Sequence, residues 1–498
     1  RRTTDGKKIS RRVTTSQRGR MRDADSIGTS DESEIIDQKL LPLERVHETC
    51  RKNISSSIID FAKSMNKSAV KGDDNIMDCD GMGNDTDEWP DLYKLTWSMI
   101  DASLVIYMLV MMRQLIRDGK IPCPEDDTNS AFLVHNALKW IREHEEILRK
   151  HIGRTEVDTF SRLVDNAVAR MEDQGVTRSD IENGKFHQEF VAIDDDDHDL
   201  VYGIGVNSLT RRIILAFRGT ETYRDILTDL DFIKMKSMPN PLSHFKGQPE
   251  YMFVHSGFYK YLYGMPKRLS KGTFMDKTRF RNKCDEILSH IEDLLEAFPG
   301  YTLYVTGHSL GGALASLFSF SAACCDLPHI KRQHPIRCIG IASPKVGNED
   351  FRAAFELLEE QNKIRYLRIV NDKDLIPMMP EQHLPLTKPL LRKQVYRHVG
   401  IELKLYNHSK GVRLSYRRLK DGLALASQDL VLTTGKYVFA LSMCAIGCCV
   451  AKREHSCHEY GERICKRSKI LEKLKLPLLY DLRLKNIDQE ILFNARNE

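Results

Sequence analysis

The sequence lacks both a strong net charge and an apolar run as long as a transmembrane helix. Its 498 residues carry a formal net charge of +5, with 41% apolar and 29% charged residues. This balance is typical of a globular chain and gives no footprint for binding nucleic acid. The apolar run at 104–112 has about nine residues, whereas a span needs ~20. We therefore expect a buried or interfacial helix there.

The sequence also lacks a regular cysteine framework. Its 12 cysteines are scattered along the chain, which favours a reducing compartment over a disulfide-stapled secreted fold. We expect a protein that is cytoplasmic or peripherally associated with a membrane. The acidic run at 194–197 has no EF-hand spacing, so it predicts a solvated turn rather than a calcium site.

Composition divides the chain into four regions. Residues 1–90 are predicted to be a largely disordered tail with room for a short helix, because apolar residues are scarce there. Residues 91–187 read as a helical extension that packs on the core. An α/β domain is expected over 188–463, with an apolar insertion near 430–450, and residues 464–498 form a C-terminal extension.

Short β-rich runs alternate with helical patterns inside the α/β domain. Strands are expected at 190–193, 200–206, 212–217, 301–305, 337–342, 364–370 and 395–405. Helices are expected at 280–298, 310–323 and 351–358. This alternation predicts a mainly parallel sheet flanked by helices.

A Gly-x-Ser-x-Gly motif lies between one such strand and helix, at Gly307, Ser309 and Gly311. A serine on this sharp turn takes strained backbone angles, and side chains two residues away on either side would collide. The turn exposes a nucleophilic hydroxyl beside a helix N-terminus, where the N–H of Leu310 can stabilise an oxyanion. The alternative is an ordinary strand-to-helix turn with a helix-capping serine.

Several further motifs occur in a fixed order around this turn. They are Leu215-Ala-Phe-Arg-Gly-Thr220, Val254-His-Ser-Gly-Phe258, Gly307-His-Ser-Leu-Gly-Gly312, Ala342-Ser-Pro-Lys-Val-Gly-Asn348 and Asn371-Asp-Lys-Asp-Leu-Ile-Pro377. Together they resemble the class 3 lipases, the fungal triacylglycerol lipase family with plant and diacylglycerol lipase relatives. The resemblance covers about 188–463 and implies an α/β-hydrolase fold.

The resemblance implies a serine lipase that hydrolyses an ester bond in acylglycerols or related glycerolipids. Phospholipase A1 or galactolipase activity with the same triad is the alternative. The expected partner is a lipid, met during transient contact with a membrane or lipid-droplet surface. No cofactor, metal or nucleic acid is implied, and no oligomeric state is indicated.

A serine nucleophile needs a base, and the base needs a carboxylate, in the chain order Ser, Asp, His. Asp374 follows a predicted strand and by resemblance falls on the family's catalytic Asp, with Asp372 as the alternative. His455 resembles the family's terminal His segment. His398 is the runner-up base. It lies in a β-rich run, where the alternative is that it merely braces the sheet. His458 is the third candidate.

The resemblance also suggests an oxyanion hole and a lid. Thr220 matches a family position that offers a hydroxyl and an N–H beside Leu310, although it could equally cap the next helix. Residues 223–239 have an apolar side that includes Ile226 and Met235, which predicts an amphipathic lid helix. The apolar run at 437–450 is either a buried helix or a segment that dips into a membrane.

Two rival functions are weighed against the hydrolase. One is a pseudoenzyme, which the presence of all triad candidates disfavours. The other is a zinc-binding module, whose spacing fits no standard finger. Its ligands would be Cys449, His455, Cys457, His458 and Cys465.

Overall fold

The fold is seen in a computed structural model. It describes residues 89–120, 143–152, 157–158, 188–193, 202–207, 210–219, 234–264, 282–380, 395–406, 411–415, 453–485 and 491–493. Almost all of the predicted tail at 1–90 and the whole run at 437–450 lie outside these residues. The account that follows concerns the described residues alone.

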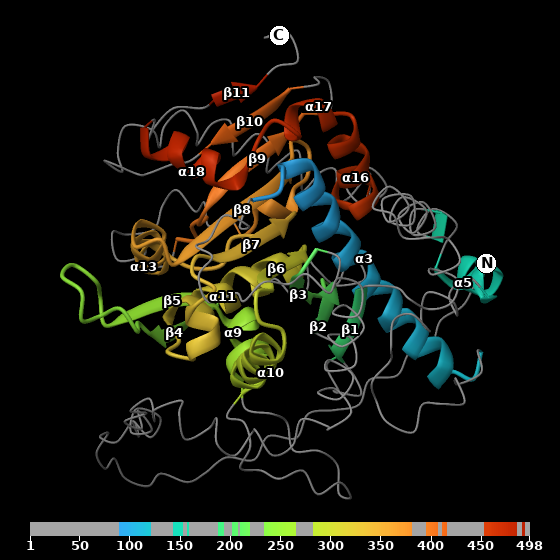
Figure 1. Ribbon diagram of the computed structural model, residues 1–498, viewed down its shortest axis with the longest axis horizontal. Coiled ribbons are helices and arrows are strands. Elements are labelled where there is room, and N and C mark those ends of the chain that lie inside the picture. Colours follow the sequence, from blue (N-terminus) through green and yellow to red (C-terminus); the bar gives the residue numbers. More distant parts are fainter. Residues whose placement is uncertain are drawn as a thin grey trace, which may run out of the picture. The chain divides into compact units, whose positions relative to one another are not determined.

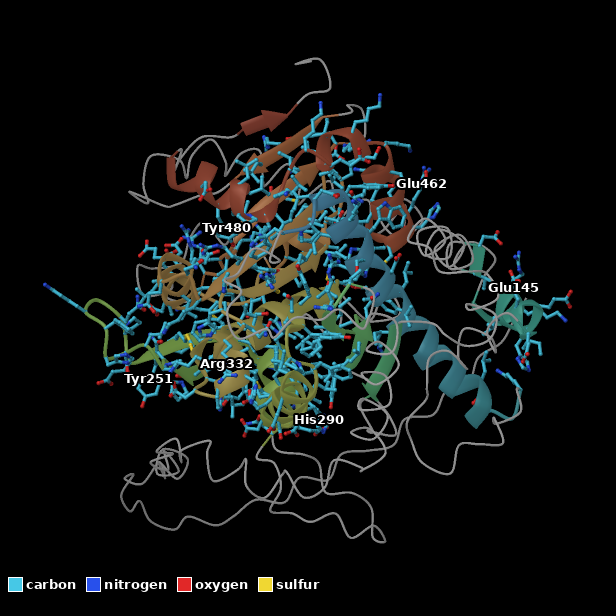
Figure 2. The ribbon with its side chains drawn as sticks, viewed as in Figure 1. Glu145, Tyr251, His290, Arg332, Glu462 and Tyr480 are labelled. Carbon is cyan, nitrogen blue, oxygen red and sulfur yellow. The ribbon has the colours of Figure 1, made fainter. Side chains whose placement is uncertain are left out.

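The main sheet places its parallel strands at the centre and antiparallel pairs at both edges (Figure 1). Its order is β1-β2-β3-β6-β7-β8-β9-β10-β11. Strands β3, β6, β7, β8 and β9 pair in parallel, and the outer pairings are antiparallel. The bounds are β1 Gln188–Ile193, β2 Tyr202–Asn207, β3 Arg212–Phe217, β6 Thr302–His308, β7 Ile336–Ile341, β8 Ile364–Asn371, β9 Ile401–Leu405, β10 Val412–Ser415 and β11 Ile491–Phe493. A separate two-stranded sheet pairs β4 Met235–Pro239 with β5 Tyr251–His255.

Helices cover both faces of the main sheet. The helices of the described residues are α3 Leu92–Arg117, α5 Glu145–Ile152, α9 Ser256–Tyr263, α10 Lys283–Ala297, α11 Leu310–Cys324, α12 Pro328–Lys331, α13 Glu349–Glu360, η1 Ile376–Met378, α16 Cys457–Cys465, α17 Ser468–Leu471 and α18 Leu476–Lys485. Side chains of α9, α10, α11 and α13 form one core with the sheet, and those of α3, α16, α17 and α18 form the other.

Strand β3 shows why the strands read as continuous apolar runs. Ile213 and Leu215 enter the first core, whereas Ile214 and Ala216 enter the second. Alternate side chains point to opposite faces of a sheet, and both faces are covered here. The predicted α/β-hydrolase fold, a largely parallel sheet between helices, is confirmed.

Helix α3 crosses the sheet and packs against β2, β3, β6 and β7 (Figure 1). It has 26 residues, much longer than its apolar run. Within the described ranges, no helix combines the length and apolar character needed to cross a membrane. Near the other end of the chain, the predicted domain boundary at residue 463 falls inside helix α16.

The structure corrects two element predictions. The strand predicted at 395–405 begins only at Ile401, and His398 lies in the preceding loop. Gly400 separates them with a left-handed φ of +74°, and a Cβ there would lie 2.5 Å from the Tyr366 carbonyl oxygen. Met235, predicted on the lid helix, is in strand β4 opposite His255, because strand pairing overrides the local helical pattern.

Candidate active site

Ser309 occupies the turn between β6 and α11. Its backbone angles are φ 58° and ψ −126°, a conformation that costs an L-residue free energy and is held only by its surroundings. The Ser309 N–H donates to the Ile341 carbonyl at 2.9 Å. The side-chain hydroxyl is buried and makes no hydrogen bond to any described residue. A buried polar group kept in this state is a candidate for chemistry.

The two motif glycines let the backbone of this turn close. A Cβ on Gly307 would lie 2.3 Å from the Gly311 carbonyl oxygen, and one on Gly311 would lie 2.2 Å from the Phe217 carbonyl oxygen. Both obstacles are backbone atoms, which cannot swing aside as a side chain does. The close approach of β3, the turn and α11 therefore requires glycine at both positions.

Asp374 and His455 are in direct contact. The His455 Nδ1 donor lies 2.9 Å from Asp374 Oδ2 and 3.1 Å from Oδ1. Both residues are buried, at 2% and 6% exposure. Asp374 Oδ1 also accepts the Ile376 N–H at 3.0 Å. A buried carboxylate on Nδ1 fixes the imidazole tautomer that leaves Nε2 able to accept a proton.

His308 connects the nucleophile turn to His455. Its Nε2 lies 2.7 Å from the His455 carbonyl oxygen, so Nε2–H donates and Nδ1 is left as an acceptor. The Tyr107 hydroxyl lies 3.2 Å from that Nδ1. The two imidazole centroids are 4.7 Å apart. Burial, followed by the neighbouring His455, lowers the pKa of His308 well below its usual value.

His308 thus links the Ser309 turn to the Asp374–His455 pair. Ser309 follows His308 directly, and His308 touches the backbone and flanks the ring of His455. A Cβ on Gly219, the last described residue before the predicted oxyanion residue Thr220, would lie 3.1 Å from Ser309 Cβ and 2.1 Å from the Tyr107 hydroxyl. The end of β3 and helix α3 thus also reach this site.

The other predicted site residues lie as follows. Asp372 pairs with Arg463 at 2.6 Å instead of with a histidine. Burial, together with Arg368 and Lys345, lowers the pKa of His398 well below its usual value. Leu310 begins α11 directly after Ser309, and His458 is in the first turn of α16. Thr220 and the lid residues 223–233, Ile226 included, lie outside the described residues.

The zinc alternative gains no support from the described cysteines. Burial raises the pKa of Cys457 to about 12, which keeps it a neutral thiol, whereas zinc binds the thiolate. His455 is held by Asp374. In the part of the chain that the structure describes, no group of His, Cys, Asp and Glu is arranged to hold a metal ion. Cys449 lies outside that part.

Two site residues escaped the sequence-based search. The Tyr460 hydroxyl donates to Asp374 Oδ2 at 2.7 Å and accepts the Asn371 N–H at 3.0 Å. The Asn371 amide donates to the Glu454 carbonyl at 3.0 Å. The aromatic residue five positions after His455 was a visible signal for Tyr460. The role of Asn371 depends on a contact across 83 residues, which no local pattern records.

Comparison with known proteins finds a family match for part of the chain. The sequence profile of the lipase (class 3) family matches residues 214–384, which include Ser309 and Asp374. Those residues are similar to the class 3 lipases. The match ends before the segment that carries His455.

The chain is also similar to plant proteins. The chain is 32% identical over 232 residues to phospholipase A1-Igamma2, chloroplastic, of Arabidopsis thaliana, covering 43% of this chain and 40% of the relative. It is 28% identical over 275 residues to phospholipase A1-Igamma1, chloroplastic, of the same plant, covering 50% of each. The chain thus spans half or less of these relatives.

Among solved structures, the chain is similar to the lipase from Rhizopus microsporus var. chinensis. The sequence identity is 22% and the TM-score 0.32, over 45% of this chain and 64% of that chain.

Proposed function

We propose that the protein is a serine-dependent carboxylic ester hydrolase of glycerolipids, with Ser309 as nucleophile, His455 as base and Asp374 as acid. The observation that carries the proposal is the buried Asp374–His455 contact at 2.9 Å. The residue after His308, which contacts His455, is Ser309, whose buried hydroxyl stands at the N-terminus of α11. A hydroxyl at its ordinary pKa is a weak nucleophile and needs such a base.

The reaction proceeds through an acyl-enzyme. His455 Nε2 takes the Ser309 proton as Oγ attacks the ester carbonyl, and Asp374 stabilises the resulting imidazolium. The N–H of Leu310 and the residue Thr220 hold the oxyanion. His455 then returns the proton to the departing alcohol. Water attacks the acyl-enzyme with His455 again as base, and the fatty acid is released.

His308 supports this assignment of the base. Burial lowers its pKa, so His308 stays neutral while its Nε2–H donates to the His455 carbonyl. A neutral imidazole whose two nitrogens are both engaged does not compete for the Ser309 proton. The proton therefore goes to the ring that faces a carboxylate.

The preferred substrates are acylglycerols, met in transient contact with a membrane or lipid-droplet surface. Phospholipase A1 activity is the second candidate, because the two plant relatives carry that name. The triad chemistry is the same for both, since the scissile ester is the same. The shape of the acyl and headgroup pocket decides between them.

A fluorophosphonate probe tests the proposed nucleophile. The folded protein is expected to be labelled, and Ser309→Ala is expected to lose the label. Ser316→Ala is a matched control, because Ser316 is a buried serine on the same helix whose hydroxyl donates to Ala313. Labelling that survives Ser309→Ala, or a wild-type protein that resists the probe, would contradict the proposal.

A lipid panel then sorts the substrates. Triacylglycerol, diacylglycerol, phosphatidylcholine and galactolipid vesicles or emulsions would be compared by kcat/KM, with the position of the released acyl chain determined. Faster release from acylglycerols supports the first candidate. Preferential release of the sn-1 chain of the phospholipid replaces it with the second.

A further inference from the structure

The acid and the base come from distant parts of the chain. Asp374 lies in the loop after β8, and His455 lies 81 residues later in the turn before α16. Hydrogen-bond reach between them requires the loop and the turn to keep a fixed separation. A displacement of about 1 Å at a reacting group is enough to slow an enzyme on the order of 100-fold.

Arg463 of α16 binds both segments at once. Its Nη1 donates to Asp372 Oδ1 at 2.6 Å, two residues from the acid. Its Nη2 donates to Glu454, the residue before the base. Its Nε donates to Glu459 of α16 at 3.0 Å. The side chain is 2% exposed, so these contacts are made out of water, where a planar guanidinium binds carboxylates with defined geometry.

The Arg463 ion cluster, made of Arg463, Asp372, Glu454 and Glu459, gathers three carboxylates around one cation. Arg453, which is largely exposed, adds a contact to Glu459 at 3.3 Å. Burial raises the pKa of Glu454, and the neighbouring Glu459 and Asp372 raise it further against the opposing effect of Arg463. Burial alone would lower the pKa of Arg463, but its hydrogen bonds to Glu459 and Asp372 raise it. Arg463 therefore stays charged and balances a crowded set of acids.

We propose that Arg463 is a positioning residue for the Asp374–His455 pair, because it ties the loop of the acid to the turn of the base. This inference rests on the proposed function. Arg463 touches neither the substrate nor the triad side chains, and it acts through Asp372 and Glu454. The neutral contact from Asn371 to the Glu454 carbonyl remains when Arg463 is changed, so the site loosens without coming apart.

The decisive variants are Arg463→Met and Arg463→Lys, assayed on a soluble ester over a range of pH. For Arg463→Met we expect kcat to fall on the order of 100-fold with little change in KM, since binding pockets are untouched. The unbalanced carboxylates of the cluster favour a positive charge nearby, so we expect the acidic limb of kcat/KM to move to higher pH by about one unit. Arg463→Lys keeps the charge but not the planar donors, so the limb returns while kcat recovers only in part.

Arg352→Met is the matched control for a purely structural effect. Arg352 on α13 is also buried, with a side chain that is 6% exposed, and it pairs with Glu356 at 2.9 Å. We expect Arg352→Met to lower Tm as Arg463→Met does, while kcat and the acidic limb stay unchanged. Equal changes of kcat and limb in both variants would overturn the positioning role.

Asp372→Asn guards against a variant that does not fold. It removes only the acid-loop end of the Arg463 ion cluster and leaves both Glu partners of Arg463 in place. We expect about a tenfold lower kcat from it, by the loss of one charge-assisted hydrogen bond. Unchanged kcat in both Asp372→Asn and a folded Arg463→Met would overturn the inference. A wild-type protein that resists the fluorophosphonate probe would instead contradict the proposed function itself.

Discussion

The nucleophile turn and the acid–base pair are held in place in different ways. Ser309 is positioned by backbone atoms, because glycines let β3, the turn and α11 approach within contact. Asp374 and His455 are held by side-chain hydrogen bonds between separate segments, among them those of Tyr460 and Asn371. The glycines and the serine of the first arrangement lie within one short stretch of sequence, 307–311. The second is encoded in pairs of residues far apart in the chain.

The largest expected effect separates the two histidines that the sequence left open. His455→Ala should lower kcat/KM about 10⁴- to 10⁶-fold, as loss of a triad base does in other serine hydrolases. His398→Ala should change it less than about tenfold, because His398 lies beside Arg368 and Lys345, whereas Asp374 pairs with His455. Steady-state hydrolysis of a soluble ester measures both. Near-normal turnover in His455→Ala, with loss in His398→Ala, would reverse the assignment.

The second comparison concerns the two aspartates of the acid loop. Asp374→Asn should lower kcat about 10⁴-fold, because an amide no longer enforces the imidazole tautomer or stabilises its charge. Asp372→Asn should cost far less, since Asp372 contacts Arg463. The same ester assay, with Tm measured for both proteins, separates chemistry from folding. A larger loss in Asp372→Asn would move the acid to that residue.

The difference between the Ser309 turn and the Asp374–His455 pair also explains which features could be predicted from the sequence. The spacing of Gly307, Ser309 and Gly311 predicts a strained turn, because the turn is formed by residues that are neighbours in the chain. The strand before it and the helix after it are predicted by the local hydrophobic pattern. The choice between His398 and His455 depends on where the chain returns after long connections, which no local pattern encodes. The prediction that Met235 lies on a lid helix was wrong for a related reason. The segment has helical spacing, but it pairs with β5 as a strand. The local sequence around Arg463 indicates only an i,i+4 ion pair with Glu459. Its contact with Asp372 is made across 91 residues.

The nucleophile turn should be sensitive to a single methyl group. In Gly311→Ala the new Cβ meets the Phe217 carbonyl carbon and oxygen, so we expect a loss of about 3 kcal/mol of stability or more. Gly461→Ala on α16 is the comparison, since its Cβ would meet only the Trp97 ring at 3.3 Å. Better helix propensity offsets that contact, and the change should stay within about 1 kcal/mol. Denaturant unfolding measures the free energy of unfolding of both variants. Similar losses in the two would contradict the tight packing inferred for the turn.

On the acid side, Tyr460→Phe should lower kcat roughly tenfold. It removes a hydroxyl that donates to the Asp374 carboxylate at 2.7 Å and also accepts the Asn371 N–H. A hydrogen bond to a charged group contributes about 1.5–3 kcal/mol, more than a neutral one. The ring itself stays packed, so Tm should change little. A kcat equal to wild type would show that Asp374 is held without this donor.

On the nucleophile side, Tyr107→Phe should have the smallest effect, about threefold in kcat. Its hydroxyl donates to a neutral imidazole at 3.2 Å, a contact worth about 0.5–1.5 kcal/mol, and the Ser309 turn is held mainly by backbone packing. If positioning by backbone atoms is the more robust of the two arrangements, the kcat of Tyr107→Phe must exceed that of Tyr460→Phe under identical conditions. The reverse order would mean that α3, through His308 and the His455 carbonyl, controls the base more tightly than α16 does.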